Sequence, residues 1–366
     1  MGMRYGLVDI GGTKIQVAVS DGQRILKQIT CKTQDLVQQQ DNANQADDLR
    51  AHAIPNYIER TLTSLLHSTH QGEKINLCAV GVSVPGPIDH EGGIVRYASH
   101  LHWDNYPLAD MLSKRLQGVP VYIEDDANCA GLGEMRFGAG QHSEHILYIT
   151  ISTGIGAALI LHRKLYRGHL GAAGEIGHMT IEPDGHLCTC GNRGCLETIA
   201  SGTAIAAQGN QLLAHDANHR LHQPLVGTHF LAQDSCDMAN THNLASTPFS
   251  RSRSVYTYTG LTASEVFDCA REGDPDCQLI VNKAGRSIGI ALANIAHIIS
   301  PETIILGGGV MKQSDYLLPI IIAEMESRLL APFRNRIHIQ TSHLADAAPL
   351  FGALTMILDR FSPTNP

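Results

Sequence analysis

The sequence predicts an α/β protein with two lobes, and three observations lead to this prediction. Strand-like and helix-like patterns alternate along most of the 366 residues, which is typical of α/β folds. A strand–turn–strand unit at residues 4–20 recurs at residues 145–162, which indicates an internal duplication. Hydrophobic residues make up 43% of the chain, which is enough for a sizeable core.

The first lobe, predicted over residues 1–123, begins with two β-rich runs joined by a turn that contains two glycines. A helix with apolar residues three and four apart follows, and then a buried strand, a second helix and a last strand. In order, these elements are predicted at residues 4–10, 15–20, 56–67, 77–84, 107–117 and 119–125.

The second lobe is predicted over residues 124–344 and repeats the alternation of strands and helices. A helix begins at about Ala127, and later elements are expected at residues 145–152, 155–162, 276–299, 302–306, 314–330 and 336–341. A final helix at 349–360 belongs to a C-terminal segment, about 345–366, which we expect to pack back on the first lobe.

Residues 208–260 differ from the rest of the chain. They are rich in Asn, Ser, Thr and His and show no sustained hydrophobic period. We therefore predict an insertion without regular structure. Order returns at Thr262, because Glu265 three residues later completes the pattern of a capping box that opens a helix.

The composition argues against several classes of protein. Lys plus Arg number 27 and Asp plus Glu number 35, so the formal net charge is −8, and no basic block is present. We therefore expect no nucleic acid and no membrane as a partner. The chain has no run of about 18 apolar residues. Its N-terminus lacks the pattern of a secretion signal, so we expect a cytoplasmic protein. Nine cysteines, an odd number, argue against a disulfide framework.

Three glycine-containing turns are candidates for binding phosphate groups. They are Gly11, Gly12, Thr13 and Lys14 after Asp9, then Thr153 and Gly154 in the repeated unit, and Gly307 and Gly308 after a strand. Glycines let backbone amides approach an anion, and Thr and Lys add a hydroxyl and a cation. The carboxylate of Asp9 suits Mg²⁺. The alternative for each segment is an ordinary turn, and the spacing does not match a P-loop.

One imidazole and three thiols lie close together in the sequence. They are His178, Cys188, Cys190 and Cys195. Three cysteines and one histidine are the ligand number and type of a closed tetrahedral Zn²⁺ site, so we predict structural zinc. Unrelated thiols are the alternative. A bound zinc ion would rigidify the loop that also carries Glu197.

Acidic residues mark two further positions. Glu124, Asp125 and Asp126 stand where a predicted strand gives way to a helix. A carboxylate there can accept the proton of a hydroxyl group during phosphoryl transfer, although acidic residues also simply stabilise helix N-termini. Glu175 precedes His178 by three residues, so on a helical turn the two face one way. The alternative for Glu175 is an ordinary solvated surface group, which is the more common role of a lone carboxylate.

Seven segments together resemble the ROK family of sugar kinases and repressors. They are DIGGTK (9–14), GVSVPGPID (81–89), DDANCA (125–130), STGIG (152–156), GAAGEIGH (171–178), CTCGNRGCLE (188–197) and LGGGV (306–310). The resemblance covers nearly the whole chain apart from about 208–260. The cysteine segment is the most specific of the seven, since DIGGTK and the triple glycine are shared with the wider sugar kinase and actin-like superfamily.

The resemblance implies a two-lobed ribonuclease-H-like fold of the actin and hexokinase type, closing over ATP and a hexose. It implies a kinase that phosphorylates the 6-hydroxyl of the sugar and uses ATP, Mg²⁺ and structural Zn²⁺. Asp126 matches the catalytic base of the family. The residues that match sugar-binding positions are Asp125, Glu175, His178, Glu197, Gly86 and His100. Those that match nucleotide and phosphate turns are Asp9, Gly11, Gly12, Thr13, Lys14, Thr153, Gly154, Gly307 and Gly308.

Two departures from the family pattern concern the sugar. Asp125 and His100 stand where the family usually has Asn, and an ionised Asp can only accept hydrogen bonds. Glucose, N-acetylglucosamine, N-acetylmannosamine, fructose and mannose all fit the resemblance. The cysteine loop with Glu197 favours glucose or an N-acetylhexosamine.

The alternative function is a sugar-binding sensor or interaction protein without kinase activity. Repressors of the family carry a DNA-binding segment ahead of the kinase-like body, and DIGGTK begins here at residue 9, so we expect no repressor. Dimers are common among similar proteins, so a homodimer is compatible with the resemblance.

Overall fold

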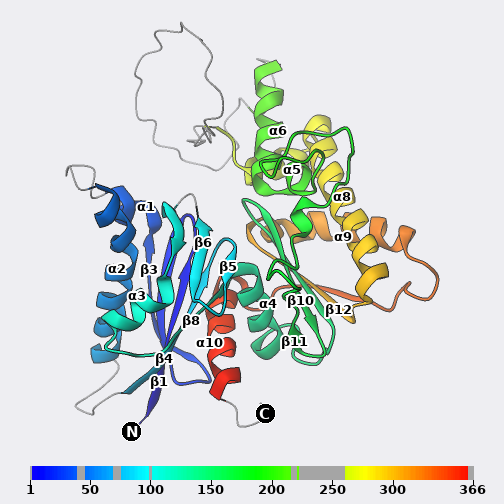
Figure 1. Cartoon of the computed structure of the whole chain (residues 1–366). Helices are drawn as coiled ribbons and strands as arrows, with labels where there is room; N and C mark the ends of the chain where they lie inside the picture. The colour runs from blue at the N-terminus through cyan, green and yellow to red at the C-terminus, as the bar shows by residue number, and fades with distance from the viewer. Residues whose placement is uncertain are drawn as a thin grey trace, which may run out of the picture.

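The computed structural model describes residues 2–38, 46–68, 76–98, 101–215, 221 and 260–361. Two five-stranded sheets form the centres of two halves of the molecule (Figure 1). None of the helices in the described ranges has the length and apolar character needed to cross a bilayer.

The first sheet has the order β3-β2-β1-β4-β8. Its strands are β1 (Met3–Ile10), β2 (Lys14–Ser20), β3 (Ile25–Lys32), β4 (Asn76–Val84) and β8 (Val121–Asp125). The first three strands along the chain pair antiparallel, whereas β1, β4 and β8 run parallel. The carboxyl ends of β1, β4 and β8 therefore lie at one edge of the sheet, where Asp9 and Asp125 stand.

The second sheet has the same design, with the order β11-β10-β9-β12-β13. Its strands are β9 (Ile146–Ile151), β10 (Ile155–Leu161), β11 (Lys164–Leu165), β12 (Thr303–Gly307) and β13 (His338–Thr341). Again three strands pair antiparallel and the last two continue in parallel. This equivalence confirms the internal duplication that the sequence predicts.

Helices and a small sheet complete the first half. They are α1 (Thr33–Gln38), α2 (Ala46–Ser68), α3 (Leu108–Arg115), and the strands β5 (Ile88–Asp89), β6 (Ile94–Ala98) and β7 (Trp103–Tyr106). Ile54, Ile58 and Leu62 of α2 pack in one apolar cluster with the inward side chains of β1, β2 and β4. The three-stranded sheet was not predicted, because strands of two to five residues show too little alternation.

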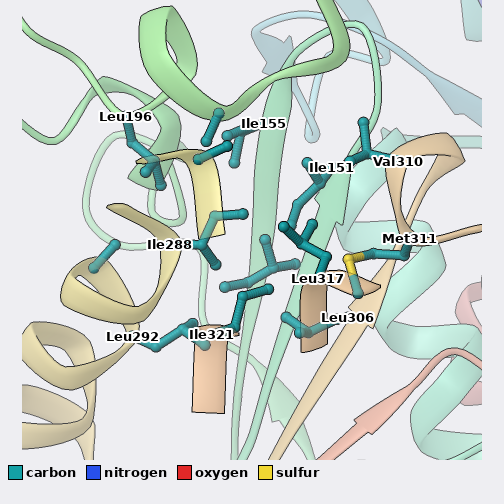
Figure 2. Packing of buried hydrophobic residues seen from close by; sticks show 14 of the residues in the cluster. Ile151, Ile155, Leu196, Ile288, Leu292, Leu306, Val310, Met311, Leu317 and Ile321 are labelled. Carbon is teal, nitrogen blue, oxygen red and sulfur yellow. The ribbon is translucent and has the colours of Figure 1, made fainter. Parts of the chain in front are cut away.

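Five helices accompany the second sheet. They are α5 (Glu197–Ala200), α6 (Gly202–His215), α7 (Ala263–Arg271), α8 (Pro275–Ile299) and α9 (Ser314–Arg328). Figure 2 shows part of their apolar core, in which Ile288 of α8 and Leu317 of α9 pack with Ile151 and Leu306 from the sheet. The predicted capping box is confirmed, because Thr262 accepts from the Glu265 amide and the Glu265 side chain accepts in return.

Two helices link the halves. α4 (Asp126–Phe137) follows β8 of the first sheet but packs on β9 and β10 of the second. α10 (Ala348–Phe361) follows the second sheet but packs on β1 and β4 of the first. The two helices also pack on each other, between the sheets (Figure 1). These contacts support grouping the C-terminal helix with the first lobe, while a division of the chain at residue 123 stays a prediction.

Two predicted boundaries are wrong. The helix predicted at residues 56–67 begins earlier, at Ala46. The insertion predicted at 208–260 does not begin at 208, because α6 continues to His215. Leu212 and Leu213 of this last turn pack against the core of the second half, which accounts for the continued helix. Most of the remaining insertion lies outside the described residues.

Candidate active site

A cleft of about 1720 Å³ lies between the two halves. Its walls bring together thirteen residues that the sequence patterns single out. They are Asp9, Gly11 to Lys14, Gly86, Asp125, Asp126, Thr153, Gly154, Glu175, His178 and Glu197. Segments far apart in the chain therefore meet at one site, as expected where carboxyl ends of parallel strands face a crevice.

The β1–β2 turn forms one wall of the cleft. The Gly11 amide donates to the Lys14 carbonyl at 2.9 Å, which closes the turn. The Thr33 hydroxyl donates to the Gly11 carbonyl at 2.7 Å and holds the turn against α1. The ammonium group of Lys14 lies 3.0 Å from the Asp346 carboxylate, just before α10. A hydrogen bond from Lys14 lowers the pKa of Asp346.

The β9–β10 turn forms the opposite wall. The Ser152 amide donates to the Gly154 carbonyl at 2.8 Å. Glu197, at the start of α5, accepts from the Ile155 amide at 2.9 Å. A Cβ atom on Gly154 would lie 2.5 Å from that same Glu197 oxygen, so a larger residue here would displace the carboxylate. The hydrogen bond from Ile155 holds Glu197 against the turn.

Asp125 and Asp126 lie at the junction of β8 and α4. Asp125 is the N-cap of α4 and accepts from the amides of Ala127 and Asn128 at 3.1 and 3.3 Å. Asp126 accepts from the Ala127 amide at 2.7 Å. Asp125 thus stabilises the N-terminus of α4, which is the alternative that the sequence left open for these carboxylates. The side chains of Asp125 and Asp126 nevertheless both line the cleft. Burial and neighbouring carboxylates raise the pKa of each.

Asp9 is the most buried carboxylate of the predicted set, with 7% of its surface exposed. The Ser83 hydroxyl donates to it at 2.8 Å. Burial raises the pKa of Asp9 to about 7, although this hydrogen bond opposes the effect. Such an oxygen ligand beside the β1–β2 turn suits a hard cation such as Mg²⁺.

Glu175 and His178 face the cleft from the loop that follows β11. His178 ends a short 3₁₀ helix (Ile176–His178), and its Nε2 lies 3.9 Å from the Glu175 carboxylate. Its Nδ1 lies 3.6 Å from the Sγ of Cys188. The two ring nitrogens therefore face different partners, one in the cleft and one in the cysteine loop.

The four predicted metal ligands cluster. One ligand atom each from His178, Cys188, Cys190 and Cys195 lies within 4.8 Å of the others. The Sγ atoms of Cys190 and Cys195 are 3.7 Å apart. Atoms at the corners of a tetrahedron with bonds of about 2.3 Å lie about 3.8 Å apart, so the cluster fits Zn²⁺.

Glycines allow the backbone of the cysteine loop to turn tightly around this cluster. Gly191 and Gly194 have φ values of 96° and 65°, which favour glycine. A Cβ atom on Gly194 would overlap the Glu182 carbonyl. A hydrogen bond from the Asn192 amide lowers the pKa of Cys190, whereas burial raises the pKa of Cys195 to about 12. Metal binding would therefore release protons from this site.

A second cavity of about 420 Å³ adjoins the β9–β10 turn. Ser152 and Thr153 line both cavities, and Gly309, Lys312 and Gln313 line the smaller one. Gly307 and Gly308 line neither of the two. A Cβ atom on Gly307 would meet the Tyr148 hydroxyl, and one on Gly308 would overlap the Ile151 carbonyl, so these glycines let β12 and the turn pack on β9.

The remaining predicted residue, His100, lies outside the described residues. Arg167 and His90 also line the cleft and were not predicted, and Glu124, noted in the sequence only for its place before Asp125 and Asp126, lies with them. Glu124 is only 1% exposed and accepts from Arg167 at 2.6 and 2.9 Å. No motif marks this pair, because its members are 43 positions apart in the chain.

Two sheets of the same strand order, which face a common cleft with a glycine turn on each wall, define an ATPase fold of the actin and hexokinase class. Residues 5–360 match the ROK family, and the chain belongs to that family. The fold class inferred from the resemblance is thereby confirmed.

Individual relatives of the chain are enzymes and regulators. It is 32% identical over 355 residues to a glucokinase from Thermotoga maritima, with 96% of each chain covered. It is 29% identical to a xylose repressor from Caldicellulosiruptor bescii, with 77% of this chain and 63% of the repressor covered. Among solved structures, a ROK family glucokinase from Streptomyces griseus in complex with glucose and AMPPNP matches with a TM-score of 0.66 at 27% identity, covering 96% of this chain and 98% of that one.

Proposed function

We propose that the protein is an ATP-dependent sugar kinase that phosphorylates the 6-hydroxyl of a hexose, with glucose or an N-acetylhexosamine favoured. The observation that carries the proposal is the position of Asp126, a half-buried carboxylate in a cleft with a glycine turn on each wall. The similarity to glucokinases over 96% of the chain supports sugar kinase activity. The glucokinase solved with glucose and AMPPNP supports the use of ATP.

Asp126 acts as the general base in this proposal. Phosphoryl transfer depends on positioning and charge stabilisation, with one carboxylate to accept the hydroxyl proton. Asp126 takes the proton of the sugar hydroxyl, and that oxygen attacks the γ-phosphate in line. The raised pKa of Asp126 improves its match to a proton acceptor near neutral pH.

The other residues of the cleft bind the two substrates. Gly11, Gly12, Thr13, Lys14, Thr153 and Gly154 hold the phosphates. Asp125, Glu175, His178, Glu197 and Gly86 contact the sugar. His100, which lies outside the described residues, is assigned to the sugar by the family resemblance alone. Asp9 would hold Mg²⁺, which neutralises phosphate charge when bound. The smaller cavity, next to Thr153, takes the remainder of the nucleotide.

Zinc has a structural role in the proposal. His178, Cys188, Cys190 and Cys195 would hold the ion, and their spacing is the support for this assignment. The ion would fix the orientation of the His178 ring, whose other nitrogen faces the cleft. It would also fix the loop that leads to Glu197.

Asp126→Asn tests the base. We expect kcat to fall by about 10³-fold or more, since removal of a general base typically costs 10²- to 10⁴-fold. The KM values for sugar and ATP should change only a few-fold, because Asn preserves the shape of the side chain. The assay is sugar-dependent ADP release with Mg²⁺ over a panel of hexoses.

Asp276→Asn is the matched control, because Asp276 also lies in the first turn of a helix but is exposed and lines neither cavity. It should leave turnover unchanged. Full turnover by Asp126→Asn would show that another group accepts the proton.

A non-catalytic sugar-binding regulator is the second candidate. The similarity to the xylose repressor favours it, although that match covers 63% of the repressor. Calorimetric binding of a hexose without any ADP release would support the regulator. ADP release that depends on the hexose would exclude it.

A further inference from the structure

Glu124 is a buried carboxylate that directly precedes the two acidic residues of the cleft. One of its oxygens accepts from the Asn128 side chain at 3.0 Å and from the Asp125 amide at 3.1 Å. Glu124 thus contacts both the residue after it and the first turn of α4. Any group that fixes this carboxylate also fixes the backbone that carries Asp125 and Asp126.

The second oxygen of Glu124 is held by Arg167, from the other half of the molecule. The Nε and Nη2 atoms of Arg167 donate to this oxygen at 2.9 and 2.6 Å. Charge-assisted bonds to a nearly fully buried carboxylate are short and directional. The ion pair therefore connects the end of β8 with the segment that follows β11.

Arg167 begins the loop that leads to Glu175. The Ala173 amide donates to the Arg167 carbonyl at 3.1 Å, so the loop closes on its own first residue. Gly168 and Gly174 have φ values of 69° and 99°, which favour glycine and allow the backbone of this loop to turn tightly. The orientation of this loop is consequently tied to the position of the Arg167 backbone.

His90 adds a third contact at the same place. Its Nδ1 lies 3.6 Å from the Glu124 oxygen that Arg167 binds. A Cβ atom on Gly171 would lie 3.6 Å from the His90 ring, so the ring lies close to the middle of the loop. His90, Glu124 and Arg167 all line the cleft.

We propose that Arg167 is a positioning residue that aligns the two halves of the sugar site. Through Glu124 it sets Asp125 and Asp126 against the loop that carries Glu175 and His178. The inference rests on the proposed function, because it assigns these four side chains to the sugar. Misplacement of catalytic groups by about 1 Å can cost about 10²-fold, so loss of this pair should mainly weaken sugar binding and turnover.

Arg167→Met is the first test. We expect the calorimetric Kd for the hexose to rise about 10- to 100-fold, while the Kd for a non-hydrolysable ATP analogue changes less than about 3-fold. Arg167→Lys keeps the charge but loses the second hydrogen bond, so it should restore part of the affinity. Arg163→Met is the control. Arg163 lies on the same β-hairpin but donates to the carbonyls of Gln141 and Ser143, and it lines neither cavity.

The double variant Arg167→Met/Glu124→Gln separates positioning from stability. Arg167→Met alone leaves a buried charge unpaired and can lower the melting temperature, whereas the double variant removes that charge. A positioning role predicts that the double variant recovers stability but not hexose affinity. Recovery of both would show that the pair only neutralises a buried charge and would overturn the inference.

Hydrogen exchange gives a readout that needs no sugar. Residues 168–175 and 124–128 should both exchange faster in Arg167→Met than in the wild type, and not in Arg163→Met. If the wild type binds no hexose, the proposed function fails and exchange decides the positioning role alone. Unchanged exchange in both segments would overturn the inference, whatever the activity.

Discussion

Asp9 is a buried residue whose negative charge should lower the stability of the fold. Its carboxylate lies beside the β1–β2 turn, and burial raises its pKa to about 7, against 3.8 for an unburied Asp. Between these values the folded protein holds a proton that the unfolded chain has released. The contribution of the neutral form to stability is therefore complete below pH 3.8 and lost as the pH rises through about 7.

Asp9→Asn should stabilise the protein more at pH 8 than at pH 5. Asn cannot ionise, so the variant avoids the free-energy cost of burying a negative charge at position 9. The wild type bears this cost in full only above the pKa of Asp9 in the folded protein. We expect the melting temperature, measured without Mg²⁺, to rise by a few degrees at pH 8 and by less at pH 5. Asp276→Asn, at an exposed position, should show no such pH dependence. An equal effect of Asp9→Asn at both pH values would contradict the raised pKa.

Individual residues were predictable where a short motif contains them. Asp125, Asp126 and the glycine turns follow strands directly, and the strand ends of a parallel sheet meet at one edge. Gly307 and Gly308 belong to the same kind of motif, yet the structure uses them for close packing rather than to line a cavity. The Glu124–Arg167 pair could not be predicted, because it depends on how the two halves pack.

Among the elements, the cysteine loop has little regular structure of its own. Its only pairing within the described residues is two isolated bridges, Thr180 with Cys195 and Leu187 with Arg193. A bound metal would replace the missing hydrophobic core of such a loop, since metal binding contributes directly to folding.

Cys190→Ser should lower both metal content and stability. Metal analysis of the wild type should find about one zinc ion per chain, and the variant should lose most of it. The melting temperature should fall, and a chelator should lower that of the wild type but not that of the variant. Cys78→Ser, outside the cluster, should retain zinc. A wild type that is metal-free and fully active would refute the zinc site.

At its closest points, the contact between α4 and α10 involves backbone atoms. A Cβ atom on Gly352 of α10 would overlap the Cys129 carbonyl of α4, and one on Gly133 would overlap the Ala348 carbonyl. Only glycine permits this approach, even though glycine disfavours a helix by up to about 1 kcal/mol relative to Ala.

Gly352→Ala should therefore destabilise the protein despite the better helix propensity of Ala. Overpacking against backbone that cannot yield costs about 3 kcal/mol, which denaturant unfolding can measure. Asp359→Ala, also on α10, removes a solvent-accessible ion pair with Arg136 of α4 and should cost less than about 1 kcal/mol. A gain in stability for Gly352→Ala would mean that the helices are farther apart than described.

At the scale of the whole molecule, the two halves exchange helices. Tyr5, Leu7 and Ala79 of the first half are buried against Leu350 and Leu354 of α10. α4, from the other direction, buries Leu132 and Met135 against the second sheet. The core of the first half is therefore incomplete without α10, which follows the second sheet in the chain. The core of the second half is incomplete without α4, which follows the first sheet.

Thermal unfolding should accordingly be a single cooperative transition. Calorimetry should give one peak whose van't Hoff and calorimetric enthalpies agree. Two resolved peaks would show that the halves are independent and that the α4–α10 contact contributes little.

Much of this architecture was predictable from the sequence. The duplicated strand–turn–strand unit and the long helix at Pro275–Ile299 have periods that are clear over many residues. The short strands of the small sheet and the end of α6 were not predictable, because tertiary contacts rather than local pattern decide them.

The place of α10 in the first half also has a consequence for biosynthesis. The strands of the first sheet are synthesised early, but the helix that covers Tyr5 and Leu7 follows every strand of both sheets in the chain. Until α10 has emerged, the nascent chain presents an uncovered apolar face to solvent or to a chaperone. The core of the first half can therefore be completed only after α10 has been synthesised.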